Sequence, residues 1–411
     1  MKRWFSSIFT VALRELRRAL KDSGVIVFFF VVPLLYPLLY AYLYNQEVVR
    51  EVPVVAVDEC RSSQSREFLR KSDATPDLKI ISYCSDMEEA RELIRTHKAY
   101  GLIHIPGEFS ERIADGLQAT VNLYSDMSGL LYYKAILSGC THVSLSMNRD
   151  IKMARLSGMS DVEKESMVQP IDYEYVPMFN PQNGFCSFII PAVLVVVIQQ
   201  TLVLGICLLV GTETERRRKG ETSLGIDYEN PMAVLLGKGL CYFLIYSFIS
   251  IYTLCIVPML FHLPQLWQAD DMLLFAVPLL LSCIFFALTL SYFVRDRESC
   301  FLLFVFVSVP LLFISGISWP ASNIPAFWKH LSHLFPSTFG INGFIRLSSM
   351  GATLSDIRRE YLCLWIQAGA YFLLSLLIFI GKNRSDDMPG IGYIRDREVE
   401  LRERLRSRWR V

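Results

Sequence analysis

Two histidines, His330 and His333, stand three residues apart in "FWKHLSHLF", a spacing that would place them one turn apart on a helix. Two imidazoles at this spacing could share a metal ion. A zinc site normally takes further protein ligands, and no carboxylate or thiol stands near this pair in the sequence. We therefore favour interfacial polar residues over metal ligands.

Other chemistry-bearing residues are scattered. Asp58, Glu59, Glu88 and Glu89 belong to segments that we expect to be exposed, where carboxylates are usually solvated. The chain has no G-x-x-x-x-G-K-[ST] phosphate loop, no H-E-x-x-H, no paired C-x-x-C and no G-x-S-x-G. It also has no basic footprint for nucleic acid. We expect no catalytic, cofactor or metal site in this chain, and no nucleic-acid partner.

Six apolar blocks lack charged residues altogether. The 411 residues are 52% hydrophobic and 20% charged, whereas soluble proteins are about 25% charged. Each block is long enough to cross the hydrocarbon core as a helix, which takes about 20 residues. One such block could be a buried core helix, but six indicate a membrane protein. The blocks are Gly24–Tyr44, Phe185–Gly211, Gly239–Phe261, Met272–Val294, Ser299–Trp319 and Tyr361–Gly381.

Lysine and arginine are distributed unevenly among the connections. They are frequent before the first block, between the second and third, between the fourth and fifth, and after the sixth. The loop "HLPQLWQAD" has none. Because positive residues stay on the cytoplasmic side, we predict that both termini are cytoplasmic and that residues 45–184 are external. The first block is too long for a cleaved signal peptide and should remain as an anchor.

The two ends of the chain have their own character. Residues 1–22 alternate apolar and basic positions at helical spacing, which predicts an amphipathic helix on the membrane surface or, alternatively, one packed on a soluble partner. Residues 382–411 form a basic tail in which Arg alternates with Glu. Residues 320–349 are too apolar for a free loop, so we expect short helices that dip into the outer leaflet.

The external segment 45–184 has the texture of a small soluble domain. Predicted strands and helices alternate along it, which favours a mixed α/β layer with a largely parallel sheet. Cys60 and Cys84 follow its first two predicted strands. If these strands are neighbours in an oxidising compartment, the two thiols could form a disulfide; two free thiols are the equal alternative.

Polar and proline residues interrupt the apolar blocks. Gln199, Gln200 and Thr201 stand in the middle of the second block, where uncharged polar groups need partners and should face the bundle or a pathway. Whether they bind cargo or join helices stays open. Pro33 in the first block would remove a backbone hydrogen bond. Tyr36, nearby, would either line a lipophilic path or contact lipid.

Three stretches, in order, resemble the membrane subunit of bacterial type 2 ABC exporters. They are "FNPQNGFCSFIIPAVLVVVIQQT" (179–201), "ETERRRKGETSLGIDYENPMAVLLGK" (213–238) and "PLLFISGISWPASNIPAFWKHLSHLFPSTFGINGFI" (310–345). The likeness extends over nearly the whole chain. One departure is the order Gly220, Glu221, Thr222, where the family usually has Gly-Thr before a Glu.

The resemblance implies that segment 212–238 carries a coupling helix that docks on a separate ABC ATPase, which would bind ATP and Mg²⁺. The implied coupling residues are Glu213, Glu215, Arg216, Arg217, Arg218, Lys219, Gly220, Pro231 and Lys238. A second permease copy or a paralogue would complete the transporter, and a periplasmic adaptor is left open. The location implied is the bacterial inner membrane.

The sequence thus predicts an α-helical integral membrane protein with six transmembrane helices and a mixed α/β extracytoplasmic domain between helices 1 and 2. The blocks contain no ionisable residue that could relay protons or sodium ions, so energy should come from a partner. Resemblance implies a non-enzymatic permease that exports a lipophilic or amphipathic substrate. The alternatives are a membrane-anchored receptor or scaffold, or a secondary transporter.

Overall fold

The computed structural model describes residues 2–156, 158–169, 171, 176–218, 230–294, 296–302, 313–317, 319–320 and 322–386. The chain divides into two compact units. The first combines Met1–Asn45 with Met178–Val411, and we call it the membrane unit. The second is Gln46–Pro177, which we call the α/β unit. Each is described by itself.

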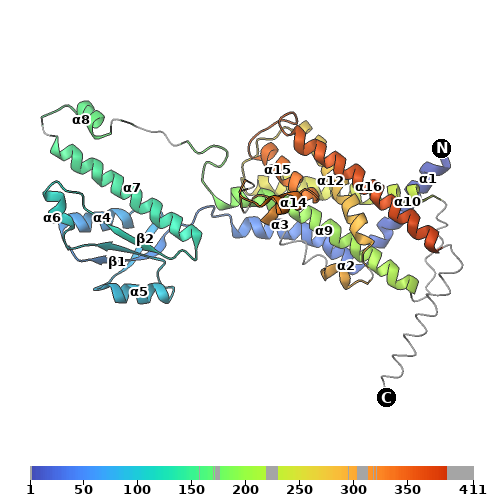
Figure 1. Cartoon of the computed structure of the whole chain (residues 1–411), viewed down its shortest axis with the longest axis horizontal. Helices are drawn as coiled ribbons and strands as arrows, with labels where there is room; N and C mark the ends of the chain where they lie inside the picture. Colours follow the sequence, from blue (N-terminus) through green and yellow to red (C-terminus); the bar gives the residue numbers. More distant parts are fainter. Residues whose placement is uncertain are drawn as a thin grey trace, which may run out of the picture. The chain divides into compact units, whose positions relative to one another are not determined.

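The described part of the membrane unit is helical (Figure 1). Its elements are α1 (Lys2–Ala19), α2 (Ser23–Ile26), the π-helix η1 (Val27–Val31), α3 (Val32–Leu43), α9 (Phe185–Arg218), α10 (Pro231–Ile251), the π-helix η2 (Tyr252–Ile256), α11 (Val257–Leu260), α12 (Ala269–Ser291), α14 (Ala326–Ser332), α15 (Pro336–Ser348) and α16 (Arg358–Asp386).

Five helical stretches of the described chain are long and apolar enough to cross a membrane. They are Ser23–Leu43, Phe185–Arg216, Pro231–Leu260, Ala269–Ser291 and Arg358–Gly381. These stretches coincide with five of the six apolar blocks. Most of the remaining block, Ser299–Trp319, lies outside the described residues. The structure is therefore that of a helical membrane protein with several apolar helices.

Helix α9 forms the centre of the membrane unit. In its most apolar stretch of 18 residues, 78% of the residues are buried, compared with 22% in the corresponding stretch of α16. Helix α9 packs against α3, α10, α12 and α15. Gly205 lets it approach η1 closely, because a Cβ there would lie 2.0 Å from Cε1 of Phe29. The buried Phe29 ring in turn meets Tyr242 and Tyr246 of α10 edge to face, at centroid distances of 5.8 and 5.4 Å.

Both π-helices end two residues before a proline: η1 precedes Pro33 and η2 precedes Pro258. Proline has no N–H to donate, and its ring clashes with the carbonyl one turn earlier, so a wider turn relieves the clash. Tyr252, the first residue of η2, donates its hydroxyl to the carbonyl of Leu34 at 2.9 Å. This hydrogen bond joins η2 to the first turn of α3, directly after η1. Pro37 lies inside α3, and Pro310 falls outside the described residues.

The amphipathic helix α1 packs one face on α10. Val11, Ala12 and Ala19 are buried on it. Phe5 and Phe9 remain about 60% exposed, at 62% and 60%. A helix of this kind, half packed and half apolar to the outside, suits the membrane surface.

The α/β unit is built on a four-stranded sheet in the order β2-β1-β3-β4. Strands β1 (Val52–Asp58), β2 (Leu78–Tyr83) and β3 (Gly101–Ile105) are parallel, and β4 (Asn122–Ser125) runs antiparallel to β3. All four strands lie within 45–184, the segment for which the sequence predicts a mixed α/β layer with a largely parallel sheet. The helices are α4 (Ser63–Asp73), α5 (Met87–Arg95), α6 (Phe109–Ala114), α7 (Leu130–Arg155) and α8 (Asp161–Val168).

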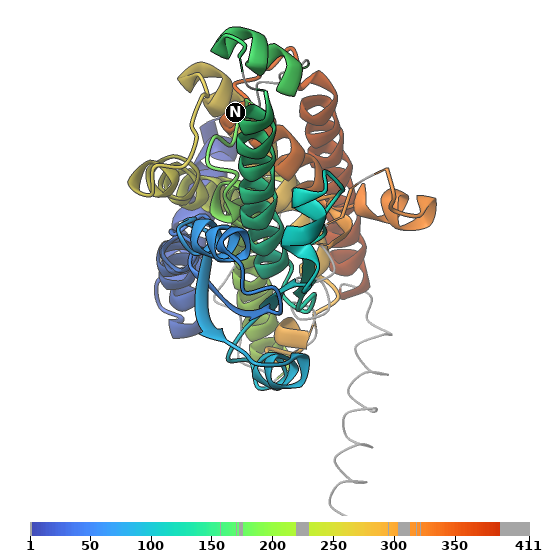
Figure 2. The same ribbon diagram turned by 90° about the vertical axis from the view of Figure 1, so that its left-hand side faces the viewer.

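Helices cover both faces of this sheet, which explains the continuous apolar run of the central strand β1. Val54 and Ala56 point into a core shared with α4, α6 and α7, whereas Val55 and Val57 pack with Ala90 of α5. In Figures 1 and 2, α5 accordingly lies on the side of the strands opposite to α4 and α7. In the structure both Cys60 and Cys84 are free thiols, so their disulfide stays a prediction.

Candidate functional site

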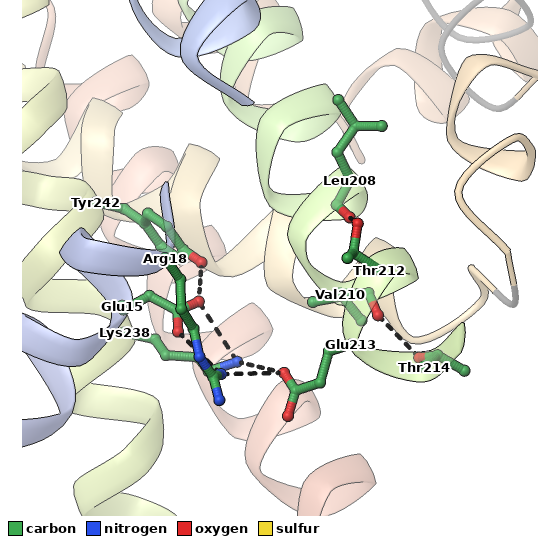
Figure 3. A network of polar contacts seen from close by, with 9 residues as sticks. All are labelled: Glu15, Arg18, Leu208, Val210, Thr212, Glu213, Thr214, Lys238 and Tyr242. Atoms are coloured by element: carbon green, nitrogen blue, oxygen red, sulfur yellow. Dashed lines mark hydrogen bonds and ion pairs between the residues drawn. The ribbon is translucent and has the colours of Figure 1, made fainter. Parts of the chain in front are cut away.

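Charged side chains from three helices meet in the membrane unit: Glu15 and Arg18 of α1, Glu213 of α9 and Lys238 of α10. We call this set the ionic junction, and Figure 3 shows the two cations between the two carboxylates. Arg18 Nη1 lies 3.8 Å from Glu15 Oε2 and 3.6 Å from Glu213 Oε2. Lys238 Nζ lies 3.6 Å from Glu15 Oε1 and 3.6 Å from Glu213 Oε2. Each cation therefore contacts both anions.

The ionic junction is largely withdrawn from solvent. The side chains of Glu15, Lys238 and Glu213 are 4%, 12% and 18% exposed. The fully buried Tyr242 donates its hydroxyl to Glu15 Oε1 at 2.5 Å. Burying an ion costs several kcal/mol unless partners compensate it, and here two carboxylates balance two cations. Removal of one member would leave an opposite charge buried without full compensation.

A glycine next to Lys238 allows the helices to come close enough for these contacts. A Cβ on Gly237 would lie 2.7 Å from Val11 Cβ and 2.8 Å from the carbonyl oxygen of Ile8. Any side chain there would push α1 away from α10. The close packing of α1 on α10 brings Glu15 within reach of Lys238.

A second charged contact lies beside the end of α9 and is centred on Arg297. Its guanidinium donates two hydrogen bonds, of 2.6 and 2.8 Å, to the carboxylate of Asp22. It also donates to Thr212 Oγ1 at 3.1 Å, and its backbone N–H donates to Glu215 Oε1 at 2.7 Å. Arg297 thus ties α9 to the start of the first apolar helix.

Asp22 has a further role as the N-cap of α2. Its Oδ1 accepts hydrogen bonds from the backbone N–H groups of Gly24 and Val25. Burial alone would raise the pKa of Asp22, but the hydrogen bonds from Arg297, Val25 and Gly24 outweigh it and hold that pKa below its usual value. A depressed pKa keeps the carboxylate ionised, and its stabilising contribution is lost only as the pH falls through that lowered value.

The structure brings together only some of the residues implied for coupling. Glu213 and Lys238 meet in the ionic junction, and Glu215 holds the backbone of Arg297. Arg216 is exposed, and Pro231 is the first residue of α10. Arg217 and Arg218 end α9, with side chains outside the described part. Lys219, Gly220 and the rest of 219–229 also lie outside the described residues.

Sequence reasoning missed most of the residues that make these contacts. Glu15, Arg18, Asp22, Tyr242 and Arg297 drew no site prediction, although one signal was present. Glu15 is the only acidic residue among the first 21, in a helix that is otherwise basic. A lone carboxylate in a basic amphipathic helix indicates a specific partner, but its partners Lys238 and Tyr242 stand 223 and 227 residues away in the sequence, which no local pattern reveals.

The polar residues in the middle of α9 serve partly to join helices. Gln199 is fully buried, and its Oε1 accepts a 2.6 Å hydrogen bond from the backbone N–H of Ser337 in the first turn of α15. Thr201 accepts a 3.1 Å hydrogen bond from Tyr246 of α10. Gln200 differs: it is 4% exposed, and neither of its amide atoms has a hydrogen-bond partner among the described residues. Among the described contacts, Nε2 of Gln199 is also without a partner, but in Gln200 both amide atoms are open to a ligand or water.

The other residues singled out in the sequence are not part of the ionic junction. Pro33 is buried in α3. Tyr36 is 41% exposed and shares a 2.9 Å hydrogen bond with Tyr40. The rings of His330 and His333 lie 6.0 Å apart between centroids. Within the described part of the chain, no cluster of three or more His, Cys, Asp or Glu side chains could hold a metal ion.

Known proteins resemble this chain over most of its length. A family model described as ABC-2 family transporter protein matches residues 24–377. The probable multidrug ABC transporter permease YbhR of Escherichia coli strain K12 is 20% identical over 340 residues, which cover 81% of this chain and 87% of the relative. The same permease of Escherichia coli O157:H7 matches equally. Glu213 and Lys238 lie within the family match, whereas α1 precedes it.

Replacing Lys238 by Met tests the ionic junction. The change leaves two carboxylates facing Arg18 alone, so we expect it to lower the free energy of unfolding by about 3 kcal/mol. The double change Lys238→Met with Glu15→Gln restores the charge balance and should cost clearly less than the sum of the single changes. Unfolding in mixed detergent and SDS micelles measures both. Arg216→Gln, at an exposed position of α9, is the control and should change little. Simple additivity would contradict the junction.

The neighbouring glutamines offer a matched pair of substitutions. Gln199→Leu leaves the Ser337 N–H buried and unpaired, which should destabilise the protein by about 1–3 kcal/mol. Gln200→Leu removes an amide that no described residue satisfies, so stability should stay unchanged or rise. The same SDS titration checks both variants. Equal losses would show that Gln200 is held by the protein as firmly as Gln199.

Proposed function

Because the chain belongs to the ABC-2 family of transporter proteins, we propose that it is the permease of an exporter that moves lipophilic or amphipathic substrates out of the cytoplasm or the inner leaflet. The observation that carries the proposal is the family match over residues 24–377. The chain is a membrane subunit and not the ATPase, so it works with an ABC ATPase partner. ATP and Mg²⁺ bind in that partner.

The topology that we propose has six spans, with Ser299–Trp319 as the fifth. Both termini face the cytoplasm of a bacterial cell, in its inner membrane, as the lysine and arginine distribution favours. The α/β unit is then extracytoplasmic.

A single chain of six spans encloses no obvious pathway, so a second copy or a paralogue completes the transporter. A periplasmic adaptor is a further candidate partner.

The substrate class follows from the relatives and from the bundle. The Escherichia coli relatives are called probable multidrug permeases, and the six blocks of this chain carry no charge that would bind an ion. The buried Gln200 amide offers a polar contact in an interior that is mostly apolar and has few uncharged polar groups. Such a path suits lipophilic molecules with few polar groups.

In this mechanism the partner acts on segment 212–238, which runs from the end of α9 to the start of α10. The ionic junction holds both helix ends to α1, and Arg297 holds α9 to Asp22. A push on the segment therefore displaces α1, α9 and α10 together. Tyr242 carries the contact inward, because its hydroxyl bonds Glu15 while its ring packs on Phe29.

Reversing the charge of Arg216 tests the coupling surface. This exposed residue makes no contact in the ionic junction, so Arg216→Glu should leave folding intact. If the segment docks on the ATPase, substrate-stimulated ATP hydrolysis in lipid discs should fall at least several-fold. Arg358→Glu, an exposed arginine at the start of α16, is the control and should keep the native stimulation. Unchanged stimulation in Arg216→Glu would count against this docking site.

A further inference from the structure

The α/β unit has a pocket of about 660 Å³ at the carboxyl ends of strands β1 and β2. Ligands of open sheets with parallel strands commonly bind at this edge. The pocket lies within one unit, between the strand ends and α4. Its lining residues are Asp58, Arg61, Arg66, Leu69, Arg70, Tyr83, Cys84 and Ser85.

Three arginines give the pocket its charge. Arg66 and Arg70 are four residues apart on α4 and so share one face, and Arg61 stands just before that helix. All three are exposed, and none has an ion pair among the residues that the structure describes. Several other basic side chains of the same unit are paired; for example, Lys71 Nζ lies 2.8 Å from Asp150, and Arg95 lies 2.8 Å from Glu92.

The acidic residue of the lining does not neutralise these arginines. Three arginines against one aspartate leave a formal charge of +2. The carboxylate of Asp58 is already engaged, since it accepts hydrogen bonds from Ser65 Oγ at 2.7 Å and from the Arg61 backbone N–H at 2.9 Å. One carboxylate among three guanidinium groups leaves a net repulsion between them, and an anion bound in the pocket would relieve it.

Apart from Ser85, the rest of the lining is formed by Leu69, Tyr83 and Cys84, which offer mainly apolar surface. Tyr83 is the last residue of β2 and is 65% exposed. The buried Leu69 and Cys84 line the pocket with it. A guanidinium binds phosphate or carboxylate through two parallel hydrogen bonds, whereas a tyrosine ring offers a flat apolar contact. The pocket thus combines an anion-binding rim with an apolar surface.

From this arrangement we propose that the pocket binds an amphipathic anion. Its phosphate or carboxylate head pairs with Arg66 and Arg70, and its apolar part lies on the ring of Tyr83. A lipid headgroup and a soluble organic phosphate or carboxylate share this chemistry. Binding needs neither ATP nor the ATPase, so it is measured independently of the proposed transport.

The test uses the full chain in phosphatidylcholine nanodiscs and titrates 1-naphthyl phosphate by calorimetry. The double change Arg66→Gln with Arg70→Gln should weaken binding at least tenfold. The matched control is Arg91→Gln with Arg95→Gln, which removes two exposed arginines, also four apart, from α5 of the same unit and should leave affinity unchanged. No binding to the native chain, or equal affinity of both double variants, would overturn the proposal.

Two further arms define the ligand. Tyr83→Ser should weaken 1-naphthyl phosphate several-fold but leave the binding of inorganic phosphate unchanged; an equal effect on both would contradict the apolar contact. Phosphatidylglycerol added to the nanodiscs should compete with the probe if a lipid headgroup is the ligand, and should have no effect if the ligand is soluble. Should the double arginine variant not elute as the native protein does, Arg61→Gln takes its place, with a several-fold loss expected.

Discussion

The hydrocarbon core of a membrane accepts almost no uncompensated charge, and the organisation of this protein depends on that constraint. The six apolar blocks carry no ionisable acidic, basic or histidine side chain. Charges next to them are matched in place: two carboxylates and two cations in the ionic junction, and Asp22 against Arg297. Neutralisation at the helix ends lets α1, α9 and α10 pack closely there. The blocks themselves contain no such residue that could relay protons or sodium ions.

The ionic junction continues into the middle of the bundle through side chains in direct contact. The Tyr242 hydroxyl bonds Glu15, its ring packs on Phe29, and Phe29 packs on Tyr246. Tyr246 in turn donates a hydrogen bond to Thr201, next to the unsatisfied Gln200. In the proposed mechanism, this series would join the end of the bundle on which the ATPase acts with the polar residues in the middle of α9. The π-helices η1 and η2 flank the same region and provide places where these helices can adjust.

Much of the architecture was predictable from the sequence, because it follows from local patterns. Apolar length locates the five spans that the structure describes, and the alternation of strand-like with helical segments predicts the layered α/β unit. The candidate site was predictable only in part. Glu213 and Lys238 stand in a motif, but Glu15 and Arg297 reach the site through packing between residues far apart in the chain. Likewise the sequence does not show which of Gln199, Gln200 and Thr201 join helices and which could bind cargo. Only their neighbours in space distinguish them.

The central claim is that this chain supplies a charge-free path and that another polypeptide supplies the energy. Uptake of a fluorescent lipophilic cation into sealed vesicles tests it most directly, with the permease alone and with its ATPase, under imposed proton or sodium gradients and with ATP. We expect accumulation only when the ATPase and ATP are both present. Concentration of the dye by the permease alone under an ion gradient would contradict the account.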